Sequence, residues 1–364
     1  MSARLVRPAL AALAALALAA LAACGGGSGP NPTPSTTATA ISDARCQQNQ
    51  DAGTITYMTG YYYQSSASIL EVLAADKLGY FDALCLDVQI KAGNGDPTTE
   101  VPLLASGKVQ IEGLAEQDLI QNNLNGLKVT GVSSYSDAGL DVLMTEPDVT
   151  DLTQLDGKTL GYKGYMPIAI QAMADKAGVD WDSLHKVKVG YDPTVLGRTV
   201  DALTGFISNE PLQLQAAGHD VKVWQPSDYG IASSLGSFAI NPDFGQKHPT
   251  AVQDFLRAVF KAFQYCADDA NVDECIGYDK DFADPTQFDA DHEKGVWTTE
   301  VGVYKAHPVP TGFGTVDMDN VAKLADLVSQ YGGQQVSADE AKSFFDDSYV
   351  AAIMDGDKVI WPAP

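Results

Sequence analysis

From residue 54 onward the chain alternates between short segments with the residue pattern of strands and longer segments with the pattern of helices. The run 54–60 is rich in β-branched and aromatic residues. The run 65–79 places large aliphatic residues at helical spacing and ends at Gly79. The next strand pattern covers 86–93. Because successive parallel strands need a crossover helix between them, this order predicts an α/β fold with helices on both faces of a parallel sheet.

The strand pattern occurs in two successive groups. The first group of predicted strands covers 54–60, 86–93, 109–115 and 127–135, and the second covers 141–146, 158–164, 186–192, 200–207 and 220–226. The run 236–242 is predicted to return to the first group, and mostly helical sequence follows it. Two α/β units of this kind, the second inserted into the first, resemble the type II periplasmic-binding-protein fold.

This fold class divides the chain into two lobes that are joined by two crossings. Residues 51–142 and 236–364 are expected to form lobe 1, and residues 143–235 are expected to form the inserted lobe 2. In open α/β sheets ligands bind beyond the carboxyl ends of the strands, so the cleft between the lobes is the expected ligand site. A hinge motion would close the lobes over the ligand.

Residues 1–23 have the layout of a secretory signal peptide, with Arg4 and Arg7 followed by an apolar Ala/Leu stretch. The stretch is shorter than the ~20 residues that a membrane-spanning helix needs. The run 21–24 (LAAC) resembles the lipobox of bacterial lipoproteins, which implies a lipid on Cys24. An uncleaved membrane anchor and ordinary cleavage beside a free thiol are the alternatives. The expected location is therefore the extracytoplasmic face of the cell membrane.

Residues 24–50 are predicted to form a tether between the lipid and the folded part. Most of this segment consists of Gly, Ser, Thr, Pro and Ala, and it has no aromatic residue. Such a composition cannot bury enough apolar surface to fold. The folded part is expected to begin between Cys46 and Thr54.

The formal net charge of −24 argues against nucleic acid and anionic lipid as partners of the folded part. It says little about a small ligand, because a cleft can differ from the average surface. A monomer that binds a small molecule is the expected state.

Four cysteines remain after Cys24, an even number in a chain predicted to be exported. Cys46 and Cys85 each precede a predicted strand, and Cys266 and Cys275 flank a short loop after a long helix. These positions favour bridges Cys46–Cys85 and Cys266–Cys275. The sequence has no CxxC pair and its five histidines are scattered, so no metal or cofactor is predicted.

Three runs resemble one family of solute-binding proteins for ABC importers. They are ILEVLAADKLGYFDALCLDVQI (69–90), LLASGKVQIEGLA (103–115) and DLTQLDGKTLGYKG (151–164). The family contains binders of sulfonates, taurine, nitrate and thiamine-pyrimidine precursors. The run 200–231 is most similar to the pyrimidine-precursor branch, mainly through Asn209-Glu210-Pro211 and Asp228-Tyr229-Gly230. The resemblance implies an ABC permease with its ATPase as the protein partner.

Polar and aromatic residues follow the first and third predicted strands of lobe 1. Tyr61, Tyr63 and Gln64 lie beyond the first strand, where a tyrosine ring could stack on a flat ligand and Gln64 could bond to its edge. Gln117 holds the equivalent place two strands later. The alternative is that the tyrosines only cover the edge of the lobe.

In lobe 2 the turn 161–166 (GYKGYM) joins a strand to a helix, so Tyr162 and Tyr165 are candidates to line the cleft. In the sulfonate and nitrate branches the resemblance implies that this turn receives an anion, and Lys163 could pair with an anionic group. A solvated surface loop is the alternative.

Glu210 follows a buried strand and opens the next helix, so free helix N–H groups are expected to support its charge. From there it could accept hydrogen bonds from an amino-heterocycle. A simple helix-capping acid is the alternative. Asn209 belongs to the same motif, and Asp228 and Tyr229 either touch the ligand or serve the hinge.

Three classes of function remain open at this point. The first is a lipid-anchored receptor that delivers a flat nitrogen heterocycle. An aminopyrimidine thiamine precursor is the leading ligand, and a flavin-type ligand is the second. A sulfonate, taurine or nitrate is the alternative ligand class for the same receptor. The second is an enzyme, because the same fold includes a eukaryotic pyrimidine synthase that consumes its own histidine and carries a cysteine cluster. This chain has no such cluster, so catalysis is not expected. The third is a lipoprotein that presents a bound ligand to a membrane sensor.

Overall fold

The computed structural model describes residues 40–286 and 288–363. The chain divides into two units, 1–36 and 37–364, and everything described below lies in the second. The predicted signal peptide, Cys24 and most of the predicted tether lie outside the described residues. Among the described helices none is both long and apolar enough to cross a membrane.

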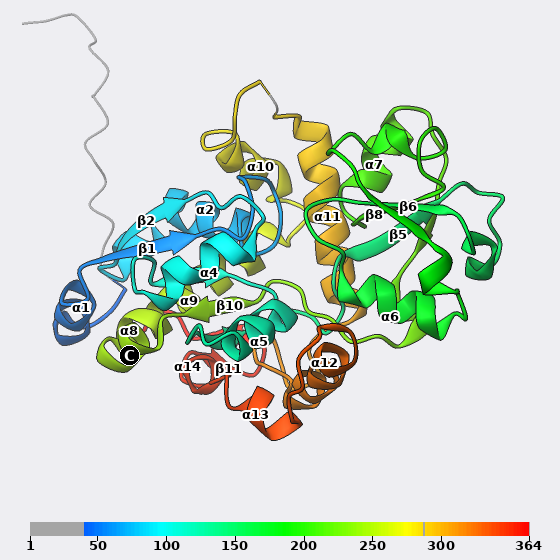
Figure 1. The fold of residues 1–364 in the computed structure, drawn as a ribbon. Coiled ribbons are helices and arrows are strands. Elements are labelled where there is room, and N and C mark those ends of the chain that lie inside the picture. Colours follow the sequence, from blue (N-terminus) through cyan, green and yellow to red (C-terminus); the bar gives the residue numbers. More distant parts are fainter. Residues whose placement is uncertain (1–39, 287, 364) are drawn as a thin grey trace, which may run out of the picture. The chain divides into compact units, whose positions relative to one another are not determined.

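Two five-stranded sheets form the centres of the two lobes (Figure 1). The sheet of lobe 1 has the order β2 (Asp87–Lys91), β1 (Thr54–Met58), β3 (Ile111–Gly113), β10 (Phe238–Ile240) and β4 (Thr130–Ser133). The sheet of lobe 2 has the order β7 (His185–Lys188), β6 (Thr159–Tyr162), β8 (Ala202–Phe206), β5 (Asp141–Thr145) and β9 (Lys222–Trp224). The predicted α/β fold with two lobes is confirmed.

The four strands β1 to β4 run parallel as predicted, but each sheet also contains one antiparallel strand that the sequence did not indicate. Strand β10 runs antiparallel to both β3 and β4, and β5 runs antiparallel to both β8 and β9. These are the two strands that the chain enters on arriving from the other lobe. A chain that crosses the cleft reaches the sheet at the carboxyl ends of the other strands, so it must run in the opposite direction.

Helices cover the sheets of both lobes. Those up to the second crossing are α1 (Asp43–Gln50), α2 (Leu70–Lys77), α3 (Tyr80–Ala83), α4 (Pro97–Ala105), α5 (Glu116–Leu124), α6 (Ile168–Lys176) and α7 (Glu210–Ala216). The C-terminal part supplies α8 (Pro242–Lys247), α9 (Pro249–Cys266), α10 (Val272–Asp279), α11 (Ala290–Ala306), α12 (Met318–Tyr331), α13 (Ala338–Lys342) and α14 (Ser348–Ala351). A small hairpin of β11 (Met354–Asp355) and β12 (Lys358–Val359) follows.

The core of lobe 1 is built around α9, whose buried face packs on α2 and on the sheet. Phe255 of this helix contacts the rings of Tyr57 and Phe81, at centroid distances of 5.4 Å in both cases. Trp297 of α11 is fully buried in the same core, and its Nε1–H donates to the carbonyl of Cys266 (2.8 Å). These contacts fix α11 to lobe 1.

The folded part begins earlier than the sequence indicated, because α1 lies inside the predicted tether 24–50. Its sequence is polar, but long-range contacts hold it in place. Arg45 pairs with buried Asp254 (2.7 Å), and the side-chain amide of Asn49 donates to the same carboxylate (2.7 Å). The predicted lobe boundary at 142/143 also falls inside β5, so lobe 2 begins at Asp141.

Both predicted disulfides are present. Cys46–Cys85 ties α1 to the turn before β2, and Cys266–Cys275 ties the end of α9 to α10. Cys46 lies on a helix and does not directly precede a strand, but the predicted pairing is correct.

Candidate ligand-binding site

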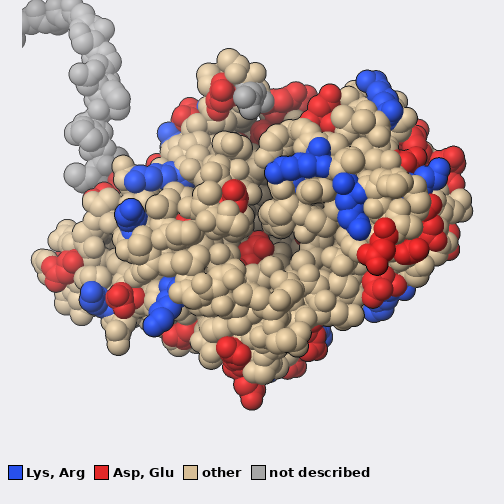
Figure 2. All heavy atoms as spheres, in the orientation of Figure 1, with Lys and Arg blue, Asp and Glu red and all other residues tan. Residues whose placement is uncertain are grey.

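A cavity of about 260 Å³ lies between the two lobes. Lobe 1 lines it with segments that follow β1, β2 and β3, and lobe 2 lines it with segments that follow β6, β7 and β8. The segments that lead into β5 and β10 complete the wall. Figure 2 shows a hollow in the middle of the molecular face that it draws, with atoms of acidic residues at the bottom of the hollow. The cavity therefore lies at the carboxyl edges of both sheets, where ligands bind in folds of this class.

Six of the ten predicted ligand residues line this cavity: Tyr61, Gln64, Gln117, Tyr165, Asn209 and Glu210. The other four do not: Tyr63, Tyr162, Asp228 and Tyr229. Tyr63 instead donates its hydroxyl to the carbonyl of Ile90 (3.2 Å) and packs on Phe282.

The remaining three predicted residues lie elsewhere in lobe 2. Tyr162 is the last residue of β6 and is paired in register with Lys188. Asp228 and Tyr229 lie in the 3₁₀ turn Pro226–Tyr229, where the Tyr229 ring packs against the core of lobe 2.

Glu210 lies at the start of α7, and the residue is 2% exposed. Its Oε2 accepts the Phe206 N–H (2.7 Å), its Oε1 accepts the Asn209 amide (3.2 Å), and it pairs with Lys163. The expected helix N–H donors are replaced by this strand N–H, this amide and the ammonium. At Gly205 an added Cβ would lie 2.6 Å from Oε2, so only glycine lets the carboxylate approach β8.

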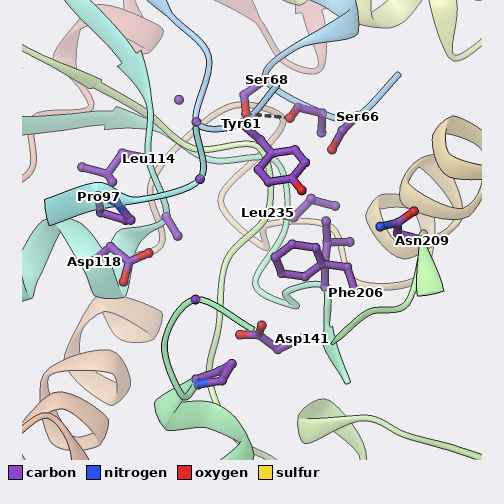
Figure 3. A pocket seen from close by; sticks show the side chains of 18 of the residues that line it. Tyr61, Ser66, Ser68, Pro97, Leu114, Asp118, Asp141, Phe206, Asn209 and Leu235 are labelled. Carbon is purple, nitrogen blue, oxygen red and sulfur yellow. Dashed lines mark hydrogen bonds between the residues drawn. The ribbon is translucent and has the colours of Figure 1, made fainter. Parts of the chain in front are cut away.

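Aromatic rings from both lobes face the cavity (Figure 3). Tyr61 comes from lobe 1, while Phe206 and Tyr191 come from lobe 2. The Tyr61 ring lies 2.6 Å from the position of a Cβ on Gly95, a residue with φ +78°, so glycine is required beneath the ring. Burial, and then the neighbouring Tyr191, raise the pKa of Tyr61 to about 12. The ring is therefore a neutral surface for a flat ligand.

Phe206 and Tyr191 were not predicted. Phe206 ends β8, so the rule that ligands lie at carboxyl strand ends would have found it. Tyr191 follows β7 and lies near the carboxyl end of the predicted strand 186–192, so the same rule would have found it.

Two carboxylates face the cavity from opposite lobes, Asp118 on α5 and Asp141 at the start of β5 (Figure 3). The hydroxyl of Tyr165 donates to Asp118 Oδ2 (3.4 Å). Burial raises the pKa of Asp118 to about 6, and burial followed by repulsion from Asp118 raises that of Asp141 to about 7. At neutral pH this wall is negative and favours a ligand with N–H donors or a positive charge.

Asp118 and Asp141 were also missed. Asp118 lies in the first turn of helix α5, and Asp141 begins strand β5. The amino end of a strand reaches the cleft only because β5 is antiparallel, which the sequence did not show.

A second cavity of about 570 Å³ continues from the first past Asp118, Asp141 and Tyr165. Side-chain amides of Asn94, Gln117 and Gln121 contribute to its lining. In the part of the chain that the structure describes, no group of three or more His, Cys, Asp or Glu side chains could hold a metal ion.

Several carboxyl groups are held neutral in the folded state, so the protein is expected to be most stable in mild acid. Burial raises the pKa of Glu71 and of Glu116 to about 8, against about 4.3 for an unfolded chain. Each group binds a proton in the folded state that the unfolded chain releases, so its contribution to stability is present below about pH 4 and is lost as the pH rises to 8. Each contributes a slope of about 1.4 kcal/mol per pH unit within that window.

The melting temperature is therefore expected to fall between pH 5.5 and pH 8.5, as measured by calorimetry. Glu71→Gln, which cannot ionise, should make the fall shallower. A melting temperature that rises over this range would contradict the assignment of neutral buried carboxyls.

Residues 66–271 match the family described as NMT1/THI5 like, which is more than half of the chain. The chain belongs to this family. The predicted resemblance to the pyrimidine-precursor branch is confirmed. The NMT1/THI5-like match runs from the loop after β1 through all of lobe 2 to the end of α9, so it includes most of the residues that line the cavity.

Individual relatives of this NMT1/THI5-like chain agree with the family. It is 28% identical to a formylaminopyrimidine-binding protein of Halalkalibacterium halodurans, over 64% of this chain and 73% of the relative. It is 24% identical to the 4-amino-5-hydroxymethyl-2-methylpyrimidine phosphate synthase THI11 of Saccharomyces cerevisiae, over 58% and 66%. The periplasmic aliphatic sulphonate-binding protein SsuA of Escherichia coli has the same fold, with a TM-score of 0.60, 12% identity and coverage of 79% and 91%.

Proposed function

We propose that this chain is the solute-binding receptor of an ABC importer and captures a small, flat amino-heterocycle of the thiamine-pyrimidine-precursor class. The observation that carries the proposal is the cavity between two lobes, with Tyr61 and Phe206 as aromatic walls and carboxylates as hydrogen-bond acceptors. The formylaminopyrimidine-binding relative supports the same ligand class.

The charges in the cavity favour an amino-heterocycle over a compact anion. Lys163 lines the cavity, but its ammonium is paired with Glu210. Asp118 and Asp141 add further negative charge to the lining. A sulfonate or nitrate would need several N–H or O–H donors and would be repelled by these carboxylates.

The yeast synthase relative raises catalysis as the second candidate function. None of the residues that the structure places in the lining of the cavity is a histidine or a cysteine. The lining is rich in groups that bind and orient, which favours a receptor. Incubation with the aminopyrimidine and recovery of unchanged compound and unchanged protein mass would separate binding from chemistry.

The leading test is isothermal titration of the protein, made under oxidising conditions, with 4-amino-5-hydroxymethyl-2-methylpyrimidine, a formylaminopyrimidine, thiamine, riboflavin, taurine, an alkanesulfonate and nitrate. We expect an aminopyrimidine to bind most tightly. Glu210→Gln should weaken that binding about 10- to 150-fold, the range for loss of a hydrogen bond to a charged group.

Asp182→Asn is the matched control, because this exposed acid of lobe 2 lies outside the cavity and should leave the affinity unchanged. Binding of an anion alone would overturn the proposed ligand class. Equal affinity in wild type and Glu210→Gln would overturn the role of the carboxylate.

We also propose that the receptor is anchored by a lipid at Cys24, on the extracytoplasmic face of the membrane. The support is the sequence of residues 1–24 alone. Metabolic labelling with a fatty acid should mark the wild type and not Cys24→Ser, and only the wild type should stay with the membrane fraction. Equal labelling of both would overturn the anchor.

A further inference from the structure

The loop between β1 and α2 is held by carboxylates of the C-terminal helices. Ser65 donates its N–H to Glu293 Oε2 (2.6 Å) and its hydroxyl to Asp279 Oδ2 (2.9 Å). This loop carries Tyr61 and Gln64 into the cavity. Side chains far along the sequence therefore fix the lobe 1 wall of the ligand site.

Glu300 of α11 extends this arrangement to lobe 2. Its carboxylate is buried, at 1% exposure, and its Oε2 accepts the Ser66 hydroxyl (2.8 Å) and the Ala67 N–H (2.7 Å) from lobe 1. Its Oε1 accepts the hydroxyl of Ser208 from lobe 2 (2.8 Å). One carboxylate thus bonds to both lobes.

The donors are parts of the cavity wall or its neighbours. Ser66 and Ala67 line the cavity, and Ser208 lies between two lining residues, Phe206 and Asn209. Glu300 itself is not in the lining. It contacts the ligand site only through the residues that it holds.

Helix α11 is placed to make this link. Trp297 anchors it in the core of lobe 1, while His292 Nε2 lies 2.9 Å from Asn209 Oδ1 of lobe 2. Beyond its C-terminal end, the carbonyl of His307 accepts the hydroxyl of Ser136, which pairs with Leu235 where the chain crosses between the lobes. Figure 1 shows α11, in orange, between the two sheets and beside α7.

We infer that the lobe arrangement of this structure is the closed one, and that Glu300 is a positioning residue that stabilises it through its simultaneous hydrogen bonds to Ser66 and Ala67 of lobe 1 and to Ser208 of lobe 2. A hinge opening that separates the lobes withdraws the Ser208 hydroxyl from Glu300 and leaves the lobe 1 bonds in place. The Ser208 bond is then a property of the closed state alone. An interaction present in one state only shifts the equilibrium toward that state.

A buried acid that served only the stability of α11 would have no need of a donor from lobe 2. A buried carboxylate is costly unless its oxygens are satisfied, and here the donors come from the two walls of the ligand site. The inference rests on the proposed function only in that closure favours ligand binding. Its main consequence is that loss of the Ser208 bond opens the lobes of the ligand-free protein.

Ser208→Ala is the sharpest variant, because it removes the lobe 2 bond and leaves three donor contacts of Glu300 with lobe 1 atoms. Ser183→Ala is the matched control. Its hydroxyl also makes hydrogen bonds within lobe 2, to Asp180 and Gly157, away from the cavity. Both variants lose one hydroxyl, so they separate the link between lobes from a general loss of hydrogen bonding.

The experiment measures the radius of gyration of ligand-free protein by small-angle X-ray scattering, together with thermal stability and the affinity for 4-amino-5-hydroxymethyl-2-methylpyrimidine. Ser208→Ala should increase the radius of gyration and weaken binding about tenfold, mostly through faster dissociation. Ser183→Ala should change neither. In a double-mutant cycle, Ser208→Ala should have little further effect in the Glu300→Ala background, which removes both acceptor oxygens.

Three outcomes test the inference about Glu300. An unchanged radius of gyration in Ser208→Ala overturns the inference, whatever the ligand does. A lowered melting temperature with unchanged affinity and radius shows a purely structural role and also overturns it. If the wild type binds no aminopyrimidine but Ser208→Ala still opens the ligand-free protein, the inference stands and the proposed ligand is wrong.

Discussion

Lys163→Met is expected to lower the free energy of unfolding by about 3–5 kcal/mol, because it leaves the buried carboxylate of Glu210 without its cation. The pair is largely shielded from water, with side-chain exposures of 14% for Lys163 and 3% for Glu210. The hydrogen bonds to Glu210 from Phe206 and Asn209 remain, but neither supplies a compensating charge. Urea denaturation at pH 7.5 measures the change.

The double variant Lys163→Met/Glu210→Gln should recover most of the lost stability, because it removes both charges together. Lys158→Met is the matched control from the same lobe. Lys158 lies 4.0 Å from Asp201, but both side chains are about half exposed, so this pair is worth about 0–1 kcal/mol. If Lys163→Met and Lys158→Met cost the same, the ion pair in the cavity does not hold Glu210 as described.

Removal of the Cys46–Cys85 bridge, as Cys46→Ala/Cys85→Ala, is the second large effect that we expect. The bridge closes a chain separation of 39 residues, for which loop-closure entropy gives about 4 kcal/mol. Cys266–Cys275 closes a separation of 9 residues, for which the same relation gives about 2.6 kcal/mol. Equilibrium unfolding of the two double variants and the wild type compares them.

The loss of Cys46–Cys85 should also loosen α1, whose remaining long-range bonds include those of Arg45 to Asp254 and Gln253 and those of Asn49 to Asp254 and Leu84. Proteolysis at α1 should therefore become faster in Cys46→Ala/Cys85→Ala and stay unchanged in Cys266→Ala/Cys275→Ala. A cost below about 1 kcal/mol for the first bridge would show that the unfolded chain is already compact in this region.

Much of the site followed from local sequence. Tyr61, Gln117 and Glu210 each lie in the segment or helix start that follows a strand, and a parallel strand delivers such residues to the cleft. Asp141 could not be found in this way, because its place depends on the direction of β5. That direction follows from the crossing between lobes and not from any local pattern.

Pairs of residues far apart in the chain could not be predicted from local sequence either. Lys163 and Glu210 meet because two turns of lobe 2 face each other. Glu300 accepts hydrogen bonds from Ser66 and Ala67, which lie more than two hundred positions earlier in the chain. The tether prediction was wrong over Asp43–Gln50 for the same reason, since α1 is held by Asp254 and Cys85 more than by its own apolar residues. Composition measures what a segment can bury by itself and not what distant residues contribute.

The place of β10 in the lobe 1 sheet determines the order in which the lobes can be completed as the chain emerges amino end first. Strands β3 and β4 do not pair with each other, because Phe238–Ile240 lies between them. All five strands of lobe 2, by contrast, lie within residues 141–224. As the chain emerges amino end first, lobe 2 has all its strands while lobe 1 still has a gap in its sheet. Lobe 1, whose first strands precede those of lobe 2 in the chain, is therefore the lobe whose sheet is completed last.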